Sequence, residues 1–181
     1  MRSGSLRQEE NTMREIGIKR LTRERFEKYG SFASILEPDG EFFGEEPVVF
    51  YRDLVQQSLG QATQASYSVC VVSQREWIVT NAEVHDRCHE TILCLDGDYL
   101  MHVAPATAEK TIPFDKIEVF LVPKGTLVNI KAGVWHQAGF PYRCDRVHVL
   151  CVLPERTYQT DCDCLDLPTE RKIKVLDTLI D

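Results

Sequence analysis

Features that would point to a membrane, a nucleic acid or an oxidising compartment are missing from this sequence. No apolar run approaches the 18 or more residues of a membrane-spanning helix. Lys and Arg form no cluster and the formal net charge is −7, which argues against a nucleic-acid partner. The seven cysteines include no CxxC pair, and residues 1–12 lack the apolar segment of a secretory signal. We therefore expect reduced thiols, a cytoplasmic location, and neither a membrane nor a nucleic-acid partner.

The length and composition suit one globular domain. A chain of 181 residues with a hydrophobic share of 43% can bury a real core. The first 12 residues are polar, and Met13 directly precedes the first apolar alternation. We expect residues 1–12 to be a polar tail, either a disordered extension or an artificial addition, and residues 13–181 to form the single domain.

Short segments rich in β-branched and aromatic residues dominate the chain after residue 46. Eight such segments, separated by Gly, Pro, Asp or Asn, predict an all-β sandwich or barrel. Residues 22–29 predict one short helix, with Thr22 as N-cap and Gly30 as its stop. Residues 32–44 are typical of a loop, and residues 168–181 fit either a helix or a strand. The eight strand segments are residues 47–55, 67–72, 76–84, 91–97, 98–105, 117–125, 126–133 and 146–153.

Two distant sets of residues resemble the split motif of the cupin jelly-roll barrel. The first half keeps the motif's His-to-Glu and Glu-to-Gly spacings, although Glu83 replaces the first histidine. In the second half, Lys131 replaces the motif's proline and Phe140 its final asparagine. The glycines allow tight turns at the hairpin ends. The matching positions are Glu83, His85, Glu90 and Gly97 in the first half, and Gly125, Lys131, Gly133 and His136 in the second.

These residue types suit a metal or an acid–base site inside a barrel. Positions two apart in a strand face the same side, so Glu83 and His85 point the same way. Imidazoles and carboxylates together bind a first-row divalent metal such as Mn, Fe, Ni or Zn, and they also perform acid–base chemistry without a metal. We predict that Glu83, His85, Glu90 and His136 are the catalytic residues and the candidate metal ligands.

The remaining histidines and the closest pair of cysteines fit other roles. His102 and His148 lie within alternating strand segments, which favours packing or surface positions. His89 lies on the opposite face from Glu90 if the strand there is regular, and a loop would restore it as a candidate ligand. Cys162 and Cys164 lack neighbouring ligands for a metal clip, so we expect a loop or a short strand near the C-terminus.

Several short motifs, in order and at matching spacing, resemble the ureidoglycolate lyase family over residues 16–168. The segments are LTRERFEKYG (21–30), FYRDL (50–54), EVH (83–85), VPKG (122–125), VWHQ (134–137), RV (146–147) and CDCLDLP (162–168). The resemblance implies a homodimeric cupin double-stranded β-helix, or jelly-roll barrel, with a short N-terminal helix and a C-terminal extension. It also implies elimination of urea from ureidoglycolate in purine breakdown and allantoin degradation, with a small carboxylic acid as substrate.

This chain departs from the family pattern at positions that bear on substrate and metal. Glu90 stands where the family has Gln, which favours metal binding, and Gln137 replaces a histidine. The family's arginine on an early strand, a carboxylate clamp, corresponds to the apolar residues 69–72. Two other interpretations stay open: a different metal-dependent cupin enzyme, such as a sugar or keto-acid isomerase or epimerase, and a non-catalytic binding cupin. The expected substrate-binding residues are Arg52, Lys131, Arg146 and Trp135, with Arg75 as a further cation.

Overall fold

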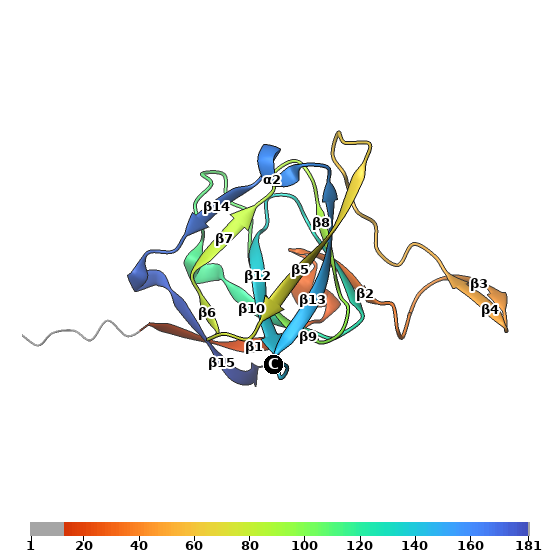
Figure 1. The fold of residues 1–181 in the computed structure, drawn as a ribbon, viewed down its shortest axis with the longest axis horizontal. Helices are drawn as coiled ribbons and strands as arrows, with labels where there is room; N and C mark the ends of the chain where they lie inside the picture. The colour runs from red at the N-terminus through yellow and green to blue at the C-terminus, as the bar shows by residue number, and fades with distance from the viewer. Residues whose placement is uncertain (1–12, 181) are drawn as a thin grey trace, which may run out of the picture.

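The strands form two facing sheets that roll into a jelly-roll barrel of the cupin type, as the sequence predicts (Figure 1). The computed structural model describes residues 13–180, and the expected tail over residues 1–12 lies outside this range. The larger sheet has eight strands and the smaller sheet has five. A two-stranded hairpin stands apart from both sheets.

The larger sheet curls until its two ends are joined by one residue of chain. β6 is the last strand in the spatial order and β7 is the second, so the two lie near opposite ends of the sheet. Only Thr80 separates them in sequence. β15, which resolves the helix-or-strand ambiguity of residues 168–181, is a strand parallel to β1. In spatial order the strands are β14 (Asp163–Asp166), β7 (Asn81–Val84), β12 (Trp135–Tyr142), β9 (Asp98–Ala104), β10 (Glu118–Val122), β1 (Arg14–Arg20), β15 (Ile173–Ile180) and β6 (Ile78–Val79).

The smaller sheet is antiparallel and faces the larger one. β5 forms one of its edges and pairs with β13 over nine residues, from Arg146 opposite Ser73 to Pro154 opposite Ala65. In spatial order its strands are β2 (Gly30–Ser34), β11 (Thr126–Ile130), β8 (Glu90–Cys94), β13 (Arg146–Pro154) and β5 (Ala65–Ser73).

Side-chain alternation along β9 divides the buried residues between two cores. Tyr99 and Met101 point between the two sheets, where they pack with Phe26 and other buried side chains. Leu100 and Ala104 point to the opposite face, where the curled part of the larger sheet encloses a second core. Successive side chains in a strand face opposite sides. β9, which is apolar at nearly every position, therefore contributes side chains to both cores.

The helices are short. α1 (Arg23–Phe26) begins where expected, because the Thr22 hydroxyl accepts a hydrogen bond from the Arg25 backbone N–H at 3.4 Å. It is shorter than the predicted helix, since the chain turns after Phe26 and enters β2. The other helical turns are η1 (Phe114–Lys116), α2 (Thr157–Thr160) and η2 (Thr169–Arg171). Within residues 13–180 no helix has the length and hydrophobicity needed to cross a bilayer.

Four features of the predicted strand pattern are corrected by the structure. Residues 32–44 are not all loop: β2 occupies their start, and β3 (Phe42–Glu45) their end. The predicted strand over residues 47–55 shortens to β4 (Val48–Tyr51), which pairs only with β3 and lies outside the barrel. The segment 76–84 splits at Thr80 into β6 and β7. β12 was not predicted, because Gly139 and Pro141 interrupt its pattern.

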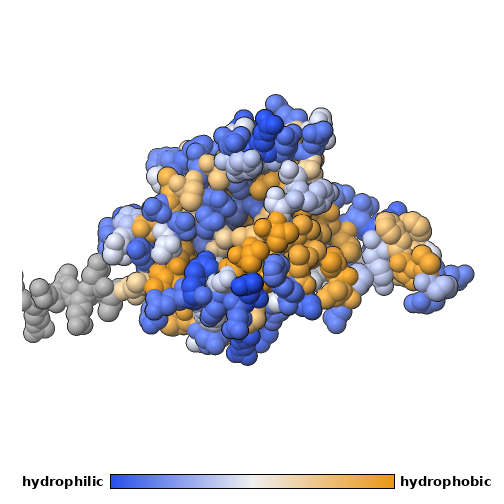
Figure 2. Space-filling model, in the orientation of Figure 1, coloured by the Kyte–Doolittle hydropathy of each residue, from blue (hydrophilic) through white to orange (hydrophobic). Residues whose placement is uncertain are grey.

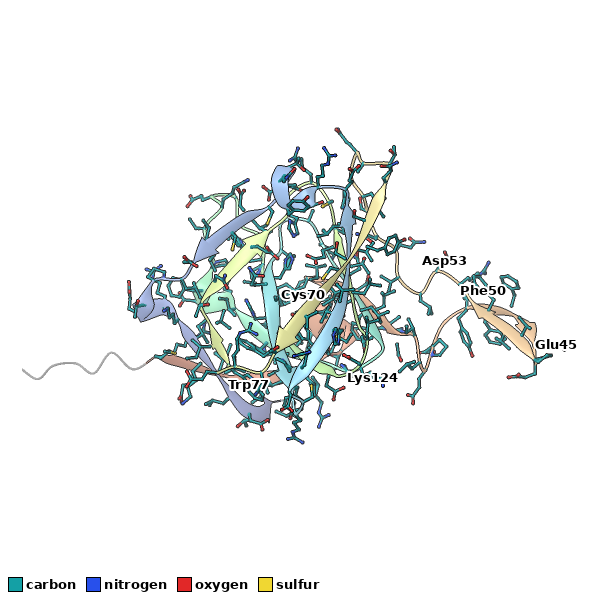
Figure 3. The ribbon with its side chains drawn as sticks, in the orientation of Figure 1. Glu45, Phe50, Asp53, Cys70, Trp77 and Lys124 are labelled. Carbon is teal, nitrogen blue, oxygen red and sulfur yellow. The ribbon has the colours of Figure 1, made fainter. Side chains whose placement is uncertain are left out.

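Residues 40–52 form an arm that projects from the barrel. The paired strands β3 and β4 make up this arm, and it points away from the rest of the molecule in Figure 1. Glu45 and Phe50, labelled in Figure 3, lie on the arm, whereas Cys70 lies within the barrel. Isolated two-stranded hairpins are at best marginally stable in water, so an arm of this kind is expected to rest on another surface.

Candidate functional site

The four predicted site residues converge from both sheets. Glu83 lies on β7, and His85 directly follows that strand, so the spacing of two points them to the same side. His136 on β12 is the strand partner of Glu83 in the larger sheet. Glu90 opens β8 in the smaller sheet. One ligand atom from each side chain lies within 4.8 Å of those of the other three, which makes this a group that could hold a metal ion.

The Glu90 carboxylate lies between the two imidazoles. Its Oε2 atom is 2.8 Å from His136 Nε2 and 3.3 Å from His85 Nε2. The two rings are 5.2 Å apart between centroids and inclined at 62°. His85, Glu90 and His136 are all buried, whereas Glu83 is partly exposed. A buried carboxylate needs this kind of compensation, because removing its charge from water is costly.

Backbone carbonyl groups fix the orientation of both imidazoles. His85 Nδ1 lies 2.6 Å from the carbonyl oxygen of Asp161, and His136 Nδ1 lies 2.8 Å from that of Val134. A carbonyl oxygen only accepts hydrogen bonds, so each Nδ1 carries a proton and donates it. Each Nε2 therefore faces Glu90. Protein metal sites have this same arrangement, in which the nitrogen that does not bind metal donates to a carbonyl or carboxylate.

The cluster is strongly coupled electrostatically. Burial alone would raise the pKa of Glu90, but the hydrogen bond with His136 and the close charges of both imidazole rings lower it to about 2. Burial would lower the pKa of His85, yet Glu90, the Asp161 carbonyl and Glu83 raise it to about 9. The pKa of His136 is also raised, because the effect of Glu90 exceeds that of burial. When no cation is present, Glu90 thus stabilises the protonated form of each imidazole ring.

The cluster borders a cavity of about 280 Å³ inside the barrel. The walls of this cavity are mostly apolar, with Ile92, Met101 and Val149 among them. No Lys or Arg from residues 13–180 lines it. A larger hollow of about 340 Å³ lies outside the barrel near α2, but the four clustered residues are not part of its lining. The inner cavity is therefore the place where the clustered groups can meet a small molecule.

Three cysteine side chains also line the cavity, although the sequence analysis assigned none of them to the site. Cys70 comes from β5, Cys151 from β13, and Cys162 precedes β14. Cys162 Sγ donates a hydrogen bond to Glu83 Oε2 at 3.3 Å. The first two could have been found from the alternation of β5 and β13, because they occupy positions that face inward.

The expected substrate-binding residues do not line this cavity. The Arg52 guanidinium pairs with Glu41 on the arm. The Lys131 ammonium donates to the Glu27 carbonyl oxygen, and Arg146 is an exposed residue at the start of β13. Trp135 is buried in the second core, because it precedes His136 and therefore faces the other side of β12.

The other expectations for histidine and cysteine agree with the structure. His102 is buried in packing against Phe140, and its Nε2–H donates to the Asn81 carbonyl oxygen at 3.2 Å. His148 pairs with Asp96 at 2.6 Å. His89 is not part of the cluster and lies near the Asn129 amide. The metal-ligand group contains no cysteine, and Cys164 lies on β14, a short strand.

Arg75 lies close to the cavity wall without entering it. Its guanidinium donates to the Gly139 carbonyl oxygen at 2.7 Å and stacks 4.5 Å above the Phe140 ring. These contacts hold the cation on the outer side of β12. The cavity therefore offers an anionic substrate no fixed positive charge other than the imidazoles or a bound cation.

Comparison with known proteins gives one match that bears on function. The sequence model of the ureidoglycolate lyase family matches residues 13–175. No curated protein sequence matches the chain significantly.

Similar solved structures include three sugar-modifying enzymes. The sugar 3,4-ketoisomerase QdtA from Thermoanaerobacterium thermosaccharolyticum, in complex with TDP, is 13% identical, covering 74% of this chain and 85% of its own with a TM-score of 0.40. The dTDP sugar isomerase from Desulfovibrio desulfuricans is 12% identical, with coverages of 77% and 83% and a TM-score of 0.42. The dTDP-4-dehydrorhamnose 3,5-epimerase from Sulfolobus tokodaii is 14% identical, with coverages of 75% and 81% and a TM-score of 0.40.

Proposed function

The chain belongs to the ureidoglycolate lyase family, and we propose that it cleaves ureidoglycolate, or a related carbinolamide acid, into glyoxylate and urea. The observation that carries the proposal is the convergence of His85, His136 and Glu90 beside Glu83 at the wall of an enclosed cavity. Elimination of urea requires a group that takes a proton from a hydroxyl and a group that gives one to nitrogen. Carboxylate and imidazole side chains are suited to both steps.

We further propose that His85, Glu90 and His136 hold a divalent cation of the Mn, Fe, Ni or Zn type. Their donor set fits such an ion, since two imidazole nitrogens and one carboxylate can bind on one side and leave positions open for substrate. His85 Nε2 is buried, and its position 3.3 Å from Glu90 does not form a hydrogen bond. A cation would satisfy this atom. When bound, it would polarise substrate oxygens as a Lewis acid and offset the substrate's carboxylate charge.

Glu83 is the proposed proton carrier. It is the most exposed of the four residues, and its carboxylate lines the cavity. The Glu83 carboxylate takes the proton of the substrate hydroxyl, and the electron pair left on that oxygen forms the carbonyl group of glyoxylate. The bond between this carbon and the urea nitrogen breaks, and the nitrogen receives the proton from Glu83. Atoms and charge balance without a further reactant.

Urea release from racemic ureidoglycolate tests this proposal. His136→Ala should abolish turnover while the protein stays folded. Glu83→Gln should lower kcat by at least about a hundredfold, the usual range for loss of a general acid–base, without changing metal content. Glu109→Gln, which alters an exposed carboxylate elsewhere, is the matched control and should retain full activity. A folded wild-type protein that contains its metal and releases no urea would refute the reaction.

The lining of the cavity favours one alternative, a metal-dependent isomerase or epimerase acting on a keto acid or sugar. Such a substrate would bind the cation through its oxygens and place apolar atoms against Ile92, Met101 and Val149. The ureido group of ureidoglycolate instead needs several polar partners. Near-stoichiometric divalent metal in protein purified without chelator, together with no urea release, would favour this alternative.

A further inference from the structure

The two residues between α2 and β14 lie beside the end of the strand that carries the site. β14 pairs with β7 on the side of β7 opposite to β12, starting with Asp163 opposite Val84 (Figure 1). His85 directly follows β7, and Asp161 and Cys162 directly precede β14. Since the two strands run antiparallel, this register brings Asp161 next to His85 although the two are far apart in the sequence.

Asp161 contacts three consecutive residues through two different groups. Its backbone carbonyl oxygen accepts the hydrogen bond from His85 Nδ1 at 2.6 Å. Its carboxylate accepts from the backbone N–H of Asp86 at 3.0 Å through Oδ1, and from that of Arg87 at 2.9 Å through Oδ2. Hydrogen bonds to an ionised acceptor are stronger than those between neutral groups. The side chain of Asp161 therefore ties its own main chain to the chain that follows His85.

Hydrogen bonds, more than apolar packing, hold this part of the chain against the barrel. α2 has a single buried residue, Thr157, and the surface over α2 is largely hydrophilic (Figure 2). The Asp161 N–H donates to the Thr157 carbonyl oxygen at 2.8 Å, which fixes Asp161 to the end of α2. The Asp161 side chain is only 11% exposed, whereas that of Arg87, whose Nε lies 3.4 Å from Oδ1, is 66% exposed. An ion pair so open to water contributes little, so the two backbone N–H groups are the main partners of the carboxylate.

The two site histidines differ in how far away their acceptors lie. His136 Nδ1 donates to the carbonyl oxygen of Val134, two residues earlier, so its orientation is local. The acceptor for His85 lies 76 residues away. His85 Nε2 has no hydrogen-bond partner within residues 13–180, so the bond from Nδ1 to Asp161 controls where Nε2 points. The orientation of His85 thus depends on what holds residue 161 in place.

We propose that Asp161 is a positioning residue, whose carboxylate fixes residues 86 and 87 so that its own carbonyl group directs His85 Nε2 toward Glu90 and a bound cation. This role in metal binding rests on the function proposed above, but the orientation of the ring is a property of the metal-free protein. Loss of a group that orients a metal ligand typically weakens metal binding or activity by about tenfold to a hundredfold.

NMR of the metal-free, isotope-labelled protein tests the orientation of His85 directly. Its Nδ1–H is buried and donates to a carbonyl oxygen, so it should exchange slowly with water and give a resolved signal, identified by its loss in His85→Gln. Asp161→Ala should lose this signal and keep that of His136. The measurement needs neither metal nor turnover, so it separates failure of this proposal from failure of the proposed reaction.

Calorimetry with Zn²⁺ measures the consequence for the metal. Asp161→Ala should bind Zn²⁺ about tenfold to a hundredfold more weakly than the wild type. Asp161→Asn keeps one acceptor oxygen, so it should show faster exchange of the His85 signal and a smaller loss of affinity. Asp98→Ala is the matched control, because Asp98 is also partly buried and accepts from the backbone N–H of a distant residue, Lys124, at 2.8 Å. Asp98 lies at the opposite end of β9 from the residue that pairs with His136, so its loss should leave the His85 signal and Zn²⁺ affinity unchanged.

The asparagine variant keeps the test decisive if Asp161→Ala does not fold. Slow exchange and wild-type affinity in the folded Asp161 variants would overturn the proposal, and so would a wild type without a protected His85 signal. Equal losses in Asp98→Ala would overturn it as well, because the effect would then follow from general destabilisation. Loss of the His85 signal in the Asp161 variants alone, together with weaker Zn²⁺ binding, would support it.

Discussion

Protonation of His102 should destabilise the protein as the pH falls. This side chain is buried against Phe140, and its Nδ1 atom has no hydrogen-bond partner. Burial, together with the nearby charges of His136 and Arg75, lowers its pKa from 6.5 to about 4, although the hydrogen bond with the Asn81 carbonyl oxygen acts in the opposite direction. The unfolded chain therefore binds a proton near pH 6.5, whereas the folded chain resists doing so until about pH 4. Stability is present above the unfolded pKa and is lost as the pH falls toward the folded pKa.

The expected size of this loss follows from the two pKa values. Between about pH 7 and about pH 5, His102 alone should reduce the free energy of unfolding by about 2 kcal/mol. Urea unfolding at both pH values, followed by tryptophan fluorescence, measures the loss in the wild type and in His102→Gln. The glutamine can still donate to the Asn81 carbonyl oxygen but does not titrate. Contributions from His85 and His136 have the opposite sign and cancel between the two proteins. An equal loss in both proteins would refute the reasoning.

Three further predictions follow from packing and from the cluster. Phe120→Ala removes a fully buried ring whose centroid lies 5.5 Å and 6.0 Å from those of two aromatic neighbours. Chemical denaturation should show that the free energy of unfolding falls by about 3–5 kcal/mol, and a fall below about 1 kcal/mol would contradict this packing. Gly139→Ala would place a Cβ atom 1.8 Å from the Leu100 carbonyl oxygen, so thermal melts should show severe destabilisation, whereas Gly97→Ala, with its nearest contact at 3.1 Å, should be tolerated better. Glu90→Gln should weaken Zn²⁺ or Mn²⁺ binding at least about tenfold by calorimetry, because an anionic ligand becomes neutral; unchanged affinity would remove Glu90 from the proposed ligands.

The candidate site was predictable because its signals are local. The spacing of two between Glu83 and His85 fixes their common side, and the split motif names His136 as their partner from a second segment. Gly125 and Gly133 both adopt positive φ, at +73° and +80°, as tight turns at the motif glycines require. Strand alternation and turn conformation both depend on residues that are close together in sequence. They are therefore kept when other positions of the motif are substituted.

The errors came from features that depend on distant parts of the chain. β12 carries Gly139 and Pro141, and its pairing with β9 shifts register between Gln137 and Phe140, so its alternation is broken. Tertiary pairing nevertheless makes it a strand in the larger sheet. Likewise, nothing local indicates that the chain crosses at Thr80 from one end of the curled sheet to the other.

The expected substrate-binding residues lie away from the cavity for a related reason. From sequence alone, any Lys or Arg residue is an equally good candidate for binding an anionic substrate. Whether its side chain points into the cavity depends on the direction it takes from the strand that carries it. Trp135 illustrates this point, since the residue next to a site histidine in a strand faces away from the site. Arg52 lies on an arm whose position relative to the barrel could not be deduced from its own sequence.

The hydrogen bonds from His85 and His136 to main-chain carbonyls have a consequence for how this protein can change over time. Every amino acid supplies a carbonyl group, so the two acceptors do not themselves depend on side-chain identity, although the Asp161 carboxylate also fixes the chain after His85 by accepting from the Asp86 and Arg87 backbone N–H groups. Substitution at those positions leaves the two acceptors where they are as long as the chain follows the same path. The orientation of the two histidines is therefore set by the path of the main chain. Residues of the cavity wall can change during evolution while this orientation is kept, so related proteins could acquire new substrates with the same histidine geometry.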